Sequence, residues 1–305
     1  MEQAYHIPVL LKQSVEALNI YSDGIYADLT FGGGGHTKEI LTHLSNKGKL
    51  YSFDQDQDAW ENAVNIKEKY PNFYLIKNNF RHLEQEIKKL QIIGELDGIL
   101  ADLGVSSHQF DTAERGFSFR FEAELDMRMN QEQQLTAQNI VNEYSEKELH
   151  KIFGIYGEIK NAKTLANTVV NNRKKKEIIT IQDLKNAIEG CIPKKEFNKY
   201  LAQVFQALRI EVNDELKVIE EMLIQSVSVL KKEGRLVVIS YHSLEDRLVK
   251  NFFQKGKFFG EVEKDFYGNE IKPFKIIEKL IIPSEEEIER NPRARSAKMR
   301  VAEKL

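Results

Sequence analysis

The first hundred residues alternate between short apolar runs and stretches with the spacing of amphipathic helices. The apolar runs are typical of buried strands, and they fall at residues 25–31, 49–53, 73–76 and 96–103. Helical spacing is found between them, for example over residues 36–44 and in a stretch that ends near residue 70. Short strands that alternate with helices predict an α/β fold with a doubly wound, mostly parallel sheet.

This alternation stops near residue 107 and returns near residue 210. The stretch between contains patterns typical of helices, at residues 146–152, 162–170, 180–188 and 197–208. A long amphipathic helix over residues 213–232 follows, then strands at 235–240 and 275–282, and then a basic tail. We therefore expect a discontinuous α/β domain formed by residues 1–106 and 211–305, interrupted by a mostly helical domain at 107–210.

Four consecutive glycines, Gly32 to Gly35, follow the first predicted strand. At this corner of an open α/β sheet, a loop without Cβ atoms allows a ligand to approach the backbone. The loop does not match the dinucleotide-binding fingerprint G-x-G-x-x-G, because the sixth position is Thr37 and not glycine. The lysine of a Walker motif is also absent. A sulfonium nucleoside such as S-adenosylmethionine has no pyrophosphate and needs no phosphate cradle. The alternative is a glycine-rich turn that binds no ligand.

Two acidic residues come at the ends of predicted strands. Asp54 follows the second strand, where a carboxylate is expected to bind a ribose diol, and this suits any adenosine-containing ligand. Asp102 ends the fourth strand, at the same edge of the sheet. It is a candidate catalytic residue that accepts an amino hydrogen of a methyl acceptor, or it holds the amino group of the cofactor, or it is structural. Phe80, after the third strand, either lies along an adenine ring or packs in the core.

The composition narrows the class of protein. The chain has 305 residues, of which 41% are apolar, and its single cysteine excludes a disulfide framework within the chain. The histidines show no H-E-x-x-H or Cys/His spacing, so we expect no metal site. No run approaches the ~20 apolar residues that span a membrane. The apolar run near the N-terminus, residues 7–11, is too short for a signal peptide, so we expect a cytoplasmic protein.

Basic residues are concentrated in two clusters although the net charge is −3. Residues 290–300 carry five basic groups and no acid, and residues 173–176 form a second cluster. Because salt screens charges beyond ~8–10 Å, local clusters rather than the total charge decide contacts with phosphate. Each cluster is either a nucleic-acid contact or a solvated surface.

Ordered blocks across nearly the whole chain carry a resemblance to a known family. The blocks are HIPVLL (6–11), TFGGGGH (30–36), DLGVSS (102–107), ERGFSFR (114–120) with LDMRM (125–129), FQALRIEVNDEL (205–216), SYHSLEDR (240–247) and NPRARS (291–296). In these blocks the chain resembles the RsmH (MraW) family of 16S rRNA cytosine-N4 methyltransferases. A glycine motif alone would be weak, but this many blocks in order are specific.

The resemblance implies a Rossmann-like class I methyltransferase with an inserted helical domain. It also implies S-adenosyl-L-methionine as the donor, and as the acceptor the N4 amine of a cytosine in the decoding centre (P site) of 16S rRNA, within the small ribosomal subunit or its precursor. Carried over by motif, the cofactor contacts fall on Gly34, Gly35, His36, Asp54, Phe80, Asp102 and Gln109. The resemblance thus assigns Asp102 to the cofactor rather than to proton transfer.

The chain departs from the family pattern at three places. His108 replaces the usual proline, residues 122–124 (EAE) replace a typical Asp-Gly-Pro, and Asn130 replaces an aspartate. None of these changes removes an expected cofactor contact. A different class of function, a non-catalytic RNA-binding ribosome assembly factor on a methyltransferase fold, remains open, as do DNA or protein as the acceptor and the oligomeric state. The glycine loop together with Asp54 and Asp102 favours the enzyme.

Overall fold

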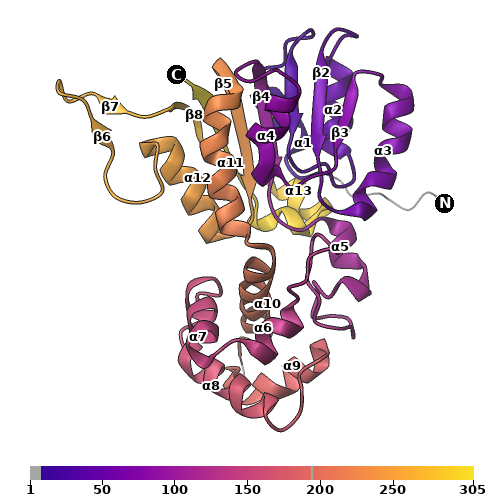
Figure 1. Cartoon of the computed structure of the whole chain (residues 1–305), viewed down its shortest axis with the longest axis vertical. Helices are drawn as coiled ribbons and strands as arrows, with labels where there is room; N and C mark the ends of the chain where they lie inside the picture. Colours follow the sequence, from indigo (N-terminus) through magenta and orange to yellow (C-terminus); the bar gives the residue numbers. More distant parts are fainter. Residues whose placement is uncertain (1–7, 194) are drawn as a thin grey trace. The chain divides into compact units, whose positions relative to one another are not determined.

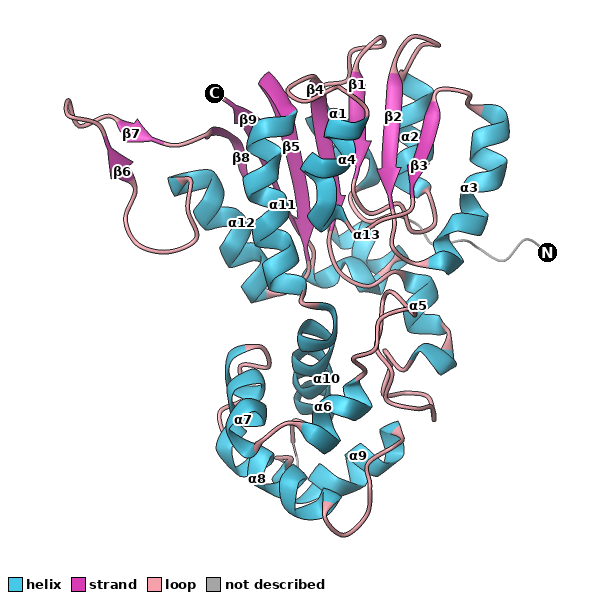
Figure 2. Ribbon diagram, viewed as in Figure 1, coloured by secondary structure: helices cyan, strands magenta, loops and turns pink. Residues whose placement is uncertain are grey.

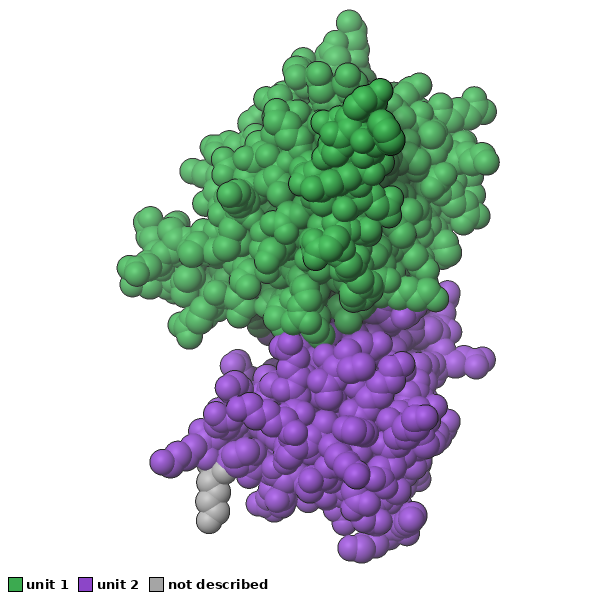
Figure 3. Space-filling model, turned by 90° about the vertical axis from the view of Figure 1, so that its left-hand side faces the viewer, with its two compact units in different colours: residues 1–104, 216–305 green, residues 105–215 purple. Residues whose placement is uncertain are grey.

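The computed structural model describes residues 8–193 and 195–305 (Figure 1). His6 and Ile7, which begin the first family block, lie outside this range. The chain divides into two compact units, coloured separately in Figure 3. Unit 1 comprises residues 1–104 and 216–305, and unit 2 comprises residues 105–215.

A seven-stranded sheet with the order β3-β2-β1-β4-β5-β9-β8 forms the centre of unit 1 (Figure 2). Its strands are β1 (Ile25–Asp28), β2 (Lys49–Phe53), β3 (Phe73–Ile76), β4 (Leu96–Asp102), β5 (Leu230–Ser240), β8 (Phe274–Ile281) and β9 (Lys298–Lys304). The first five strands of this order pair in parallel, and β9 is antiparallel to both of its neighbours. The strand order reverses between β1 and β4. The expected mostly parallel α/β sheet of Rossmann-like type is therefore confirmed.

Helices cover both faces of this sheet (Figure 2). The helices of unit 1 are α1 (Leu11–Leu18), α2 (Gly35–His43), α3 (Gln57–Lys69), α4 (Leu83–Lys89), α11 (Glu215–Val229), α12 (Ser243–Lys255) and α13 (Glu285–Arg290), with single 3₁₀ turns at Phe80–His82 and Pro292–Ser296. One apolar core contains buried side chains of α4, α11 and α12, and a second contains those of α1, α2 and α3. Two separate cores on opposite faces are typical of a doubly wound sheet.

The prediction of a basic tail after the last strand is wrong in part, because a further strand, β9, follows. Residues 298–304 do not follow the sheet but lie within it, and Val301 and Ala302 are fully buried. Arg300, counted as a phosphate-binding candidate, donates to the two carboxylate oxygens of Asp246 at 2.7 and 3.1 Å. The exposed part of the basic segment is therefore Arg290, Arg293 and Arg295.

The long helix and the first strand both end earlier in the structure than the sequence predicted. The long helix was expected to run to residue 232 and end at Gly234, but α11 ends at Val229. Leu230 already pairs with Leu96 on β4, and an irregular segment follows in which Glu233 has φ +67°. The first strand was expected to reach residue 31, but β1 ends at Asp28, where the chain turns into the glycine loop.

Unit 2 is helical and has its own apolar core. Its helices are α5 (Ser107–Asp111), α6 (Ala137–Glu143), α7 (Glu146–Ile155), α8 (Ala162–Arg173), α9 (Ile181–Ile188) and α10 (Phe197–Asn213), with 3₁₀ turns at Ala113–Arg115 and Glu189–Cys191. Four N-caps follow one pattern, in which the hydroxyl of a serine or threonine accepts from the backbone N–H three residues on, and its own backbone N–H donates to the side chain of that residue. These caps precede α5, α6, α7 and α9. These local signals explain why helices were predictable here.

A two-stranded hairpin of unit 1, β6 (Glu263–Lys264) with β7 (Glu270–Ile271), projects away from the sheet (Figure 1). Among the described residues, no helix is long and apolar enough to cross a membrane.

Candidate cofactor site

The candidate residues of unit 1 lie at the edge of the sheet where β1, β2 and β4 end. These strands are parallel neighbours, so their carboxyl ends open onto the same side. The glycine loop leaves β1, Asp54 follows β2, and Asp102 is the last residue of β4. Because the strand order reverses between β1 and β4, this edge is where open α/β sheets bind ligands.

The Asp54 carboxylate holds the glycine loop. One oxygen accepts from the backbone N–H of Gly32 at 2.8 Å, and the other accepts from that of Asp56 at 2.9 Å. Each carboxylate oxygen has a second acceptor position, so the side chain can still bind a ribose diol. Burial raises the pKa of Asp54 to about 7, against the lowering effect of these two hydrogen bonds.

A fully buried acid supports the loop from the other side. Asp28 accepts from the hydroxyl of Thr37 at 2.7 Å and from the backbone N–H of Thr30 at 3.2 Å. The hydroxyl of Ser52 on β2 lies 2.7 Å from that of Thr37. Burial raises the pKa of Asp28. This network connects β1, β2 and the first turn of α2 and fixes the path of the loop between them.

The absent side chains at Gly34 and Gly35 make room for the protein itself. Gly34 has φ +73°, and a Cβ there would lie 2.7 Å from the end of Ile66 and 3.0 Å from the ring of Phe31. A Cβ on Gly35 would lie 2.1 Å from the ring of Pro8. Protein atoms fill the directions in which these Cβ atoms would point, and the approach of a ligand to the backbone of the loop stays a prediction. Glycine is required at both positions because neighbouring side chains pack closely against them, and at Gly34 also because the backbone is left-handed.

Replacing Gly34 with alanine is expected to lower the free energy of unfolding by about 1–2 kcal/mol, the cost of a left-handed backbone for a residue with a Cβ. Because the loop must also shift away from Ile66, binding of S-adenosylmethionine should weaken. Urea unfolding and calorimetric titration measure both effects. Gly190→Ala is the control, since its added Cβ would have no atom within 4 Å. Equal stability of Gly34→Ala and wild type would contradict the argument.

The second acid, Asp102, is linked to the loop through its neighbours. Its backbone N–H donates to the hydroxyl of Thr30 at 2.7 Å, and its carboxylate accepts from the hydroxyl of Tyr241 at 2.7 Å. The Nδ1 of His36 lies 3.8 Å from its other oxygen. Burial raises the pKa of Asp102 to about 6, although His36 and Tyr241 both favour the charged form. Asp102 is therefore mostly ionised at pH 7 and can accept a hydrogen bond or a proton.

His36 is buried and faces two acceptors. Its Nε2 lies 3.1 Å from the carbonyl oxygen of Val9, which can only accept, so this nitrogen carries the proton. Burial lowers the pKa of His36. The ring fixes the segment before α1 to the loop, a role that the sequence did not indicate.

The other two candidates have different surroundings. Phe80 is half-buried and packs against the core that contains α4, α11 and α12, so its proposed contact with adenine stays a prediction. Gln109 belongs to unit 2, where its side-chain oxygen accepts from the backbone N–H of Ser106 and caps α5. Its proposed contact with the cofactor also stays a prediction. His108, the departure from proline, is exposed in the first turn of α5, a position where either residue is accommodated.

Two residues of this site were missed because their partners are distant in sequence. Thr30 and Tyr241 both hold Asp102, and Tyr241 lies 139 positions from it. The next residue, His242, caps α12 by accepting from the backbone N–H of Glu245, and the carboxylate of Glu245 accepts from the backbone N–H of Tyr241. The turn after β5 is thereby fixed beside Asp102.

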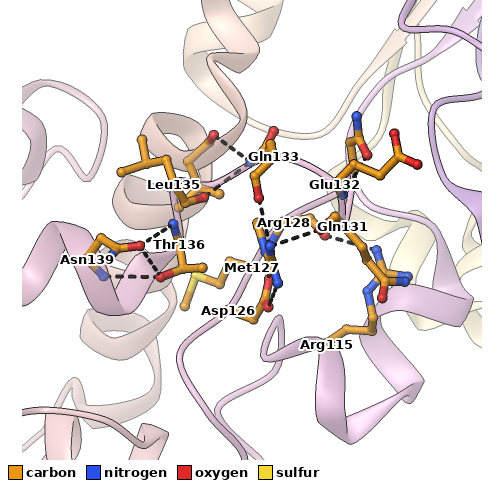
Figure 4. Close-up of polar contacts among 12 residues, drawn as sticks. Arg115, Asp126, Met127, Arg128, Gln131, Glu132, Gln133, Leu135, Thr136 and Asn139 are labelled. Atoms are coloured by element: carbon orange, nitrogen blue, oxygen red, sulfur yellow. Dashed lines mark hydrogen bonds and ion pairs between the residues drawn. The ribbon is translucent and has the colours of Figure 1, made fainter.

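Within unit 2, the family block at residues 114–129 forms a loop held by two arginines (Figure 4). Arg128 binds Asp126 with two hydrogen bonds, at 2.9 and 2.6 Å, and also donates to the carbonyls of Gln131 and Gln133. Arg115 donates to the carbonyls of Arg128 and Met129. Most of these donors point at backbone carbonyls of the loop, so the block has a clear structural role.

A family model described as the MraW methylase family matches residues 3–305. The chain belongs to this family. Among curated relatives of the family, it is 57% identical over 300 residues to "Ribosomal RNA small subunit methyltransferase H" of Cytophaga hutchinsonii, covering 98% of this chain and 99% of the relative. It is 55% identical over 295 residues to the protein of the same name from Flavobacterium psychrophilum, covering 97% and 100%.

Among solved structures, a putative methyltransferase from Streptococcus mutans in complex with SAH covers 98% of this chain and 100% of its own, at 15% identity and a TM-score of 0.41. An rRNA methylase from Streptococcus thermophilus covers 98% and 99%, at 14% identity and a TM-score of 0.41. These similarities are too low to support a functional argument. Family membership rests on the match along the chain itself.

Proposed function

We propose that this protein transfers a methyl group from S-adenosyl-L-methionine to the N4 amine of a cytosine in the decoding centre (P site) of 16S rRNA. It does so in the cytoplasm, on the small ribosomal subunit or its precursor. The observation that carries the proposal is the coincidence of the family match with the site. The same edge of the sheet that the family blocks mark holds a tightly supported loop between two carboxylates, Asp54 and Asp102.

The described residues fit the cofactor in chemical type. Asp54 retains acceptor positions for the ribose diol of the cofactor, and Asp102 is an anion that can accept hydrogen bonds from the cofactor's amino group. Phe80 offers an aromatic face for the adenine. When bound, S-adenosylmethionine supplies an electrophilic methyl carbon on a sulfonium, so the protein needs no metal for this transfer.

The acceptor requires positioning more than activation by a strong base. The lone pair of cytosine N4 is delocalised into the ring, so the nitrogen must be held about 3 Å from the methyl carbon and in line with the breaking bond. A hydrogen-bond acceptor on the amino group localises this pair. Asp102 is the candidate in unit 1 for that second role, because its pKa of about 6 leaves it ionised at neutral pH.

The most direct test is mass spectrometry of 16S rRNA from cells with and without the gene for this protein. We expect one N4-methyl group on a decoding-centre cytosine to be lost on deletion and restored by the wild-type gene. Complementation with Asp54→Ala separates an enzyme from an assembly factor, because an assembly factor would not depend on cofactor binding. An unchanged methylation pattern on deletion would overturn the proposal.

The exposed arginines after α13 are expected to contact phosphate. Arg293 and Arg295 are exposed on the 3₁₀ turn that precedes β9. If both contact RNA, replacing them with alanine should weaken binding and lower the slope of log K against log salt by about 1.4, since each phosphate contact on a single strand contributes about 0.7. Filter binding of 16S rRNA over a range of salt concentrations measures this slope.

The matched control removes the same charge from another surface of unit 1. Lys67 and Lys69 are exposed on α3, and their replacement with alanine should leave the slope unchanged. A wild-type slope in the arginine variant would mean that this turn does not contact phosphate.

A further inference from the structure

The hairpin of β6 and β7 carries the most exposed aromatic side chains of the described residues. Phe266 is 97% exposed and Tyr267 is 87% exposed, both at the hairpin tip, and Phe259 in the preceding loop is 76% exposed. The two tip rings have their centroids 5.6 Å apart and their planes at 88°. In this edge-to-face arrangement each ring keeps at least one open face, and neither is packed into a core.

The tip that displays these rings is well ordered by hydrogen bonds. Asp265 accepts from the backbone N–H groups of Tyr267 and Asn269 at 2.8 and 2.9 Å, and from the side-chain amide of Asn269 at 2.9 Å. Its own backbone exchanges bonds with Gly268 and Asn269, and Gly268 has φ +89°. The turn therefore holds the two aromatic residues outward without any contribution from their side chains.

The charges around the tip are balanced and mostly paired. Lys257 forms an ion pair with Glu263, and Lys272 forms one with Glu270. The carboxylate of Asp265 is occupied within the turn. The hairpin therefore lacks the excess of positive charge that would draw phosphates, and a nucleic acid bound here would be held by its bases.

We infer that the Phe266–Tyr267 tip binds single-stranded ribosomal RNA by stacking on one or two unpaired bases, away from the methylation site. The inference rests on the proposed function, which makes ribosomal RNA the substrate. Base stacking needs only an open aromatic face. A stable protein interface buries about 800 Å² on each partner, and two aromatic side chains offer about 500 Å² at most. A two-ring tip flanked by paired charges is thus better matched to a base than to a protein surface.

The test compares the affinity of full-length variants for small ribosomal subunits purified from cells that lack this protein. Replacing Phe266 and Tyr267 with leucine keeps an apolar surface but removes the π faces. We expect the Kd to rise about 5- to 150-fold if one base is stacked. The salt dependence of binding and the Kd for S-adenosylmethionine should not change. Exchanging the two residues, as Phe266→Tyr with Tyr267→Phe, should restore affinity to within about two-fold. Tyr21→Leu is the control, an aromatic residue that is 63% exposed elsewhere in unit 1.

Three results would overturn the inference. The first is a wild-type Kd for the leucine variant, and the second is a reduced salt slope in that variant, which would indicate phosphate contact. The third is a loss of affinity without any nucleotide cross-linked by ultraviolet light to the peptide of residues 265–272 in the wild-type complex, which would indicate a protein partner. The proposed function is tested separately in the same preparation, because wild-type protein should methylate these subunits whatever the hairpin does.

Discussion

Replacing Asp54 with alanine is expected to weaken binding of S-adenosylmethionine by about 100-fold or more. Two ribose hydroxyls would lose a charged acceptor, at about 1.5–3 kcal/mol for each hydrogen bond. The backbone N–H groups of Gly32 and Asp56 would lose their acceptor as well, so the glycine loop would be less well held. Isothermal titration calorimetry measures the change in Kd.

The control is Glu61→Ala, which removes an exposed carboxylate on the nearby helix α3 and should bind the cofactor normally. The pH dependence provides an independent check. The ligand prefers the ionised carboxylate, and the pKa of Asp54 is about 7 in the free protein, so wild-type binding should weaken as the pH falls through 7. In Asp54→Asn this component should be absent. Equal Kd values for wild type and Asp54→Ala at pH 7.5 would remove Asp54 from the cofactor site.

Replacing Asp102 with alanine is expected to lower the activity strongly. Whether the loss appears in the Kd for S-adenosylmethionine or in kcat distinguishes the two roles proposed for this residue. If Asp102 binds the amino group of the cofactor, the Kd for S-adenosylmethionine should rise about 10- to 150-fold, which corresponds to one charge-assisted hydrogen bond. If it holds the cytosine amine, kcat should fall by a similar factor while that Kd stays unchanged. We expect the first result, in accord with the family resemblance.

Tyr241→Phe tests the same carboxylate without removing it. The hydroxyl of Tyr241 donates to Asp102 and lowers its pKa, so its loss should raise the pKa of Asp102 above about 6. The acidic limb of the pH–rate profile should then move to higher pH, with little change in protein stability. An unaltered profile in Tyr241→Phe, together with full activity of Asp102→Ala, would exclude Asp102 from both roles.

Strands were predictable where a mostly apolar segment is flanked by turns. The expected strands at residues 49–53 and 73–76 agree with β2, which is buried after its first residue, and with the edge strand β3, which is partly buried. β9 was missed because Lys298 and Arg300 made its start resemble a solvated tail. The charge of Arg300 is compensated by Asp246, 54 positions away, and no local pattern can reveal such a partner.

The site was predictable to the extent that strand ends reveal it. Asp54 and Asp102 follow apolar strands directly, and parallel strands bring such ends to one edge. The sequence did not reveal that Asp54 holds the loop through Gly32, or that Tyr241 approaches Asp102. Both contacts depend on which strands are neighbours in the sheet. β4 and β5 are such neighbours although the whole of unit 2 lies between them in the sequence.

The position of β9 has a consequence for the order in which the protein acquires its structure during translation. The ribosome delivers β9 after β8, yet β9 lies between β8 and β5. Until it arrives, β5 presents an unpaired edge and β8 has no partner in the sheet, and such edges promote aggregation. The core of unit 2 uses only residues within 105–215 and can form earlier. The nascent chain can thus fold its inserted helical unit first. The sheet, whose strands come from both sides of that unit in the sequence, is completed last.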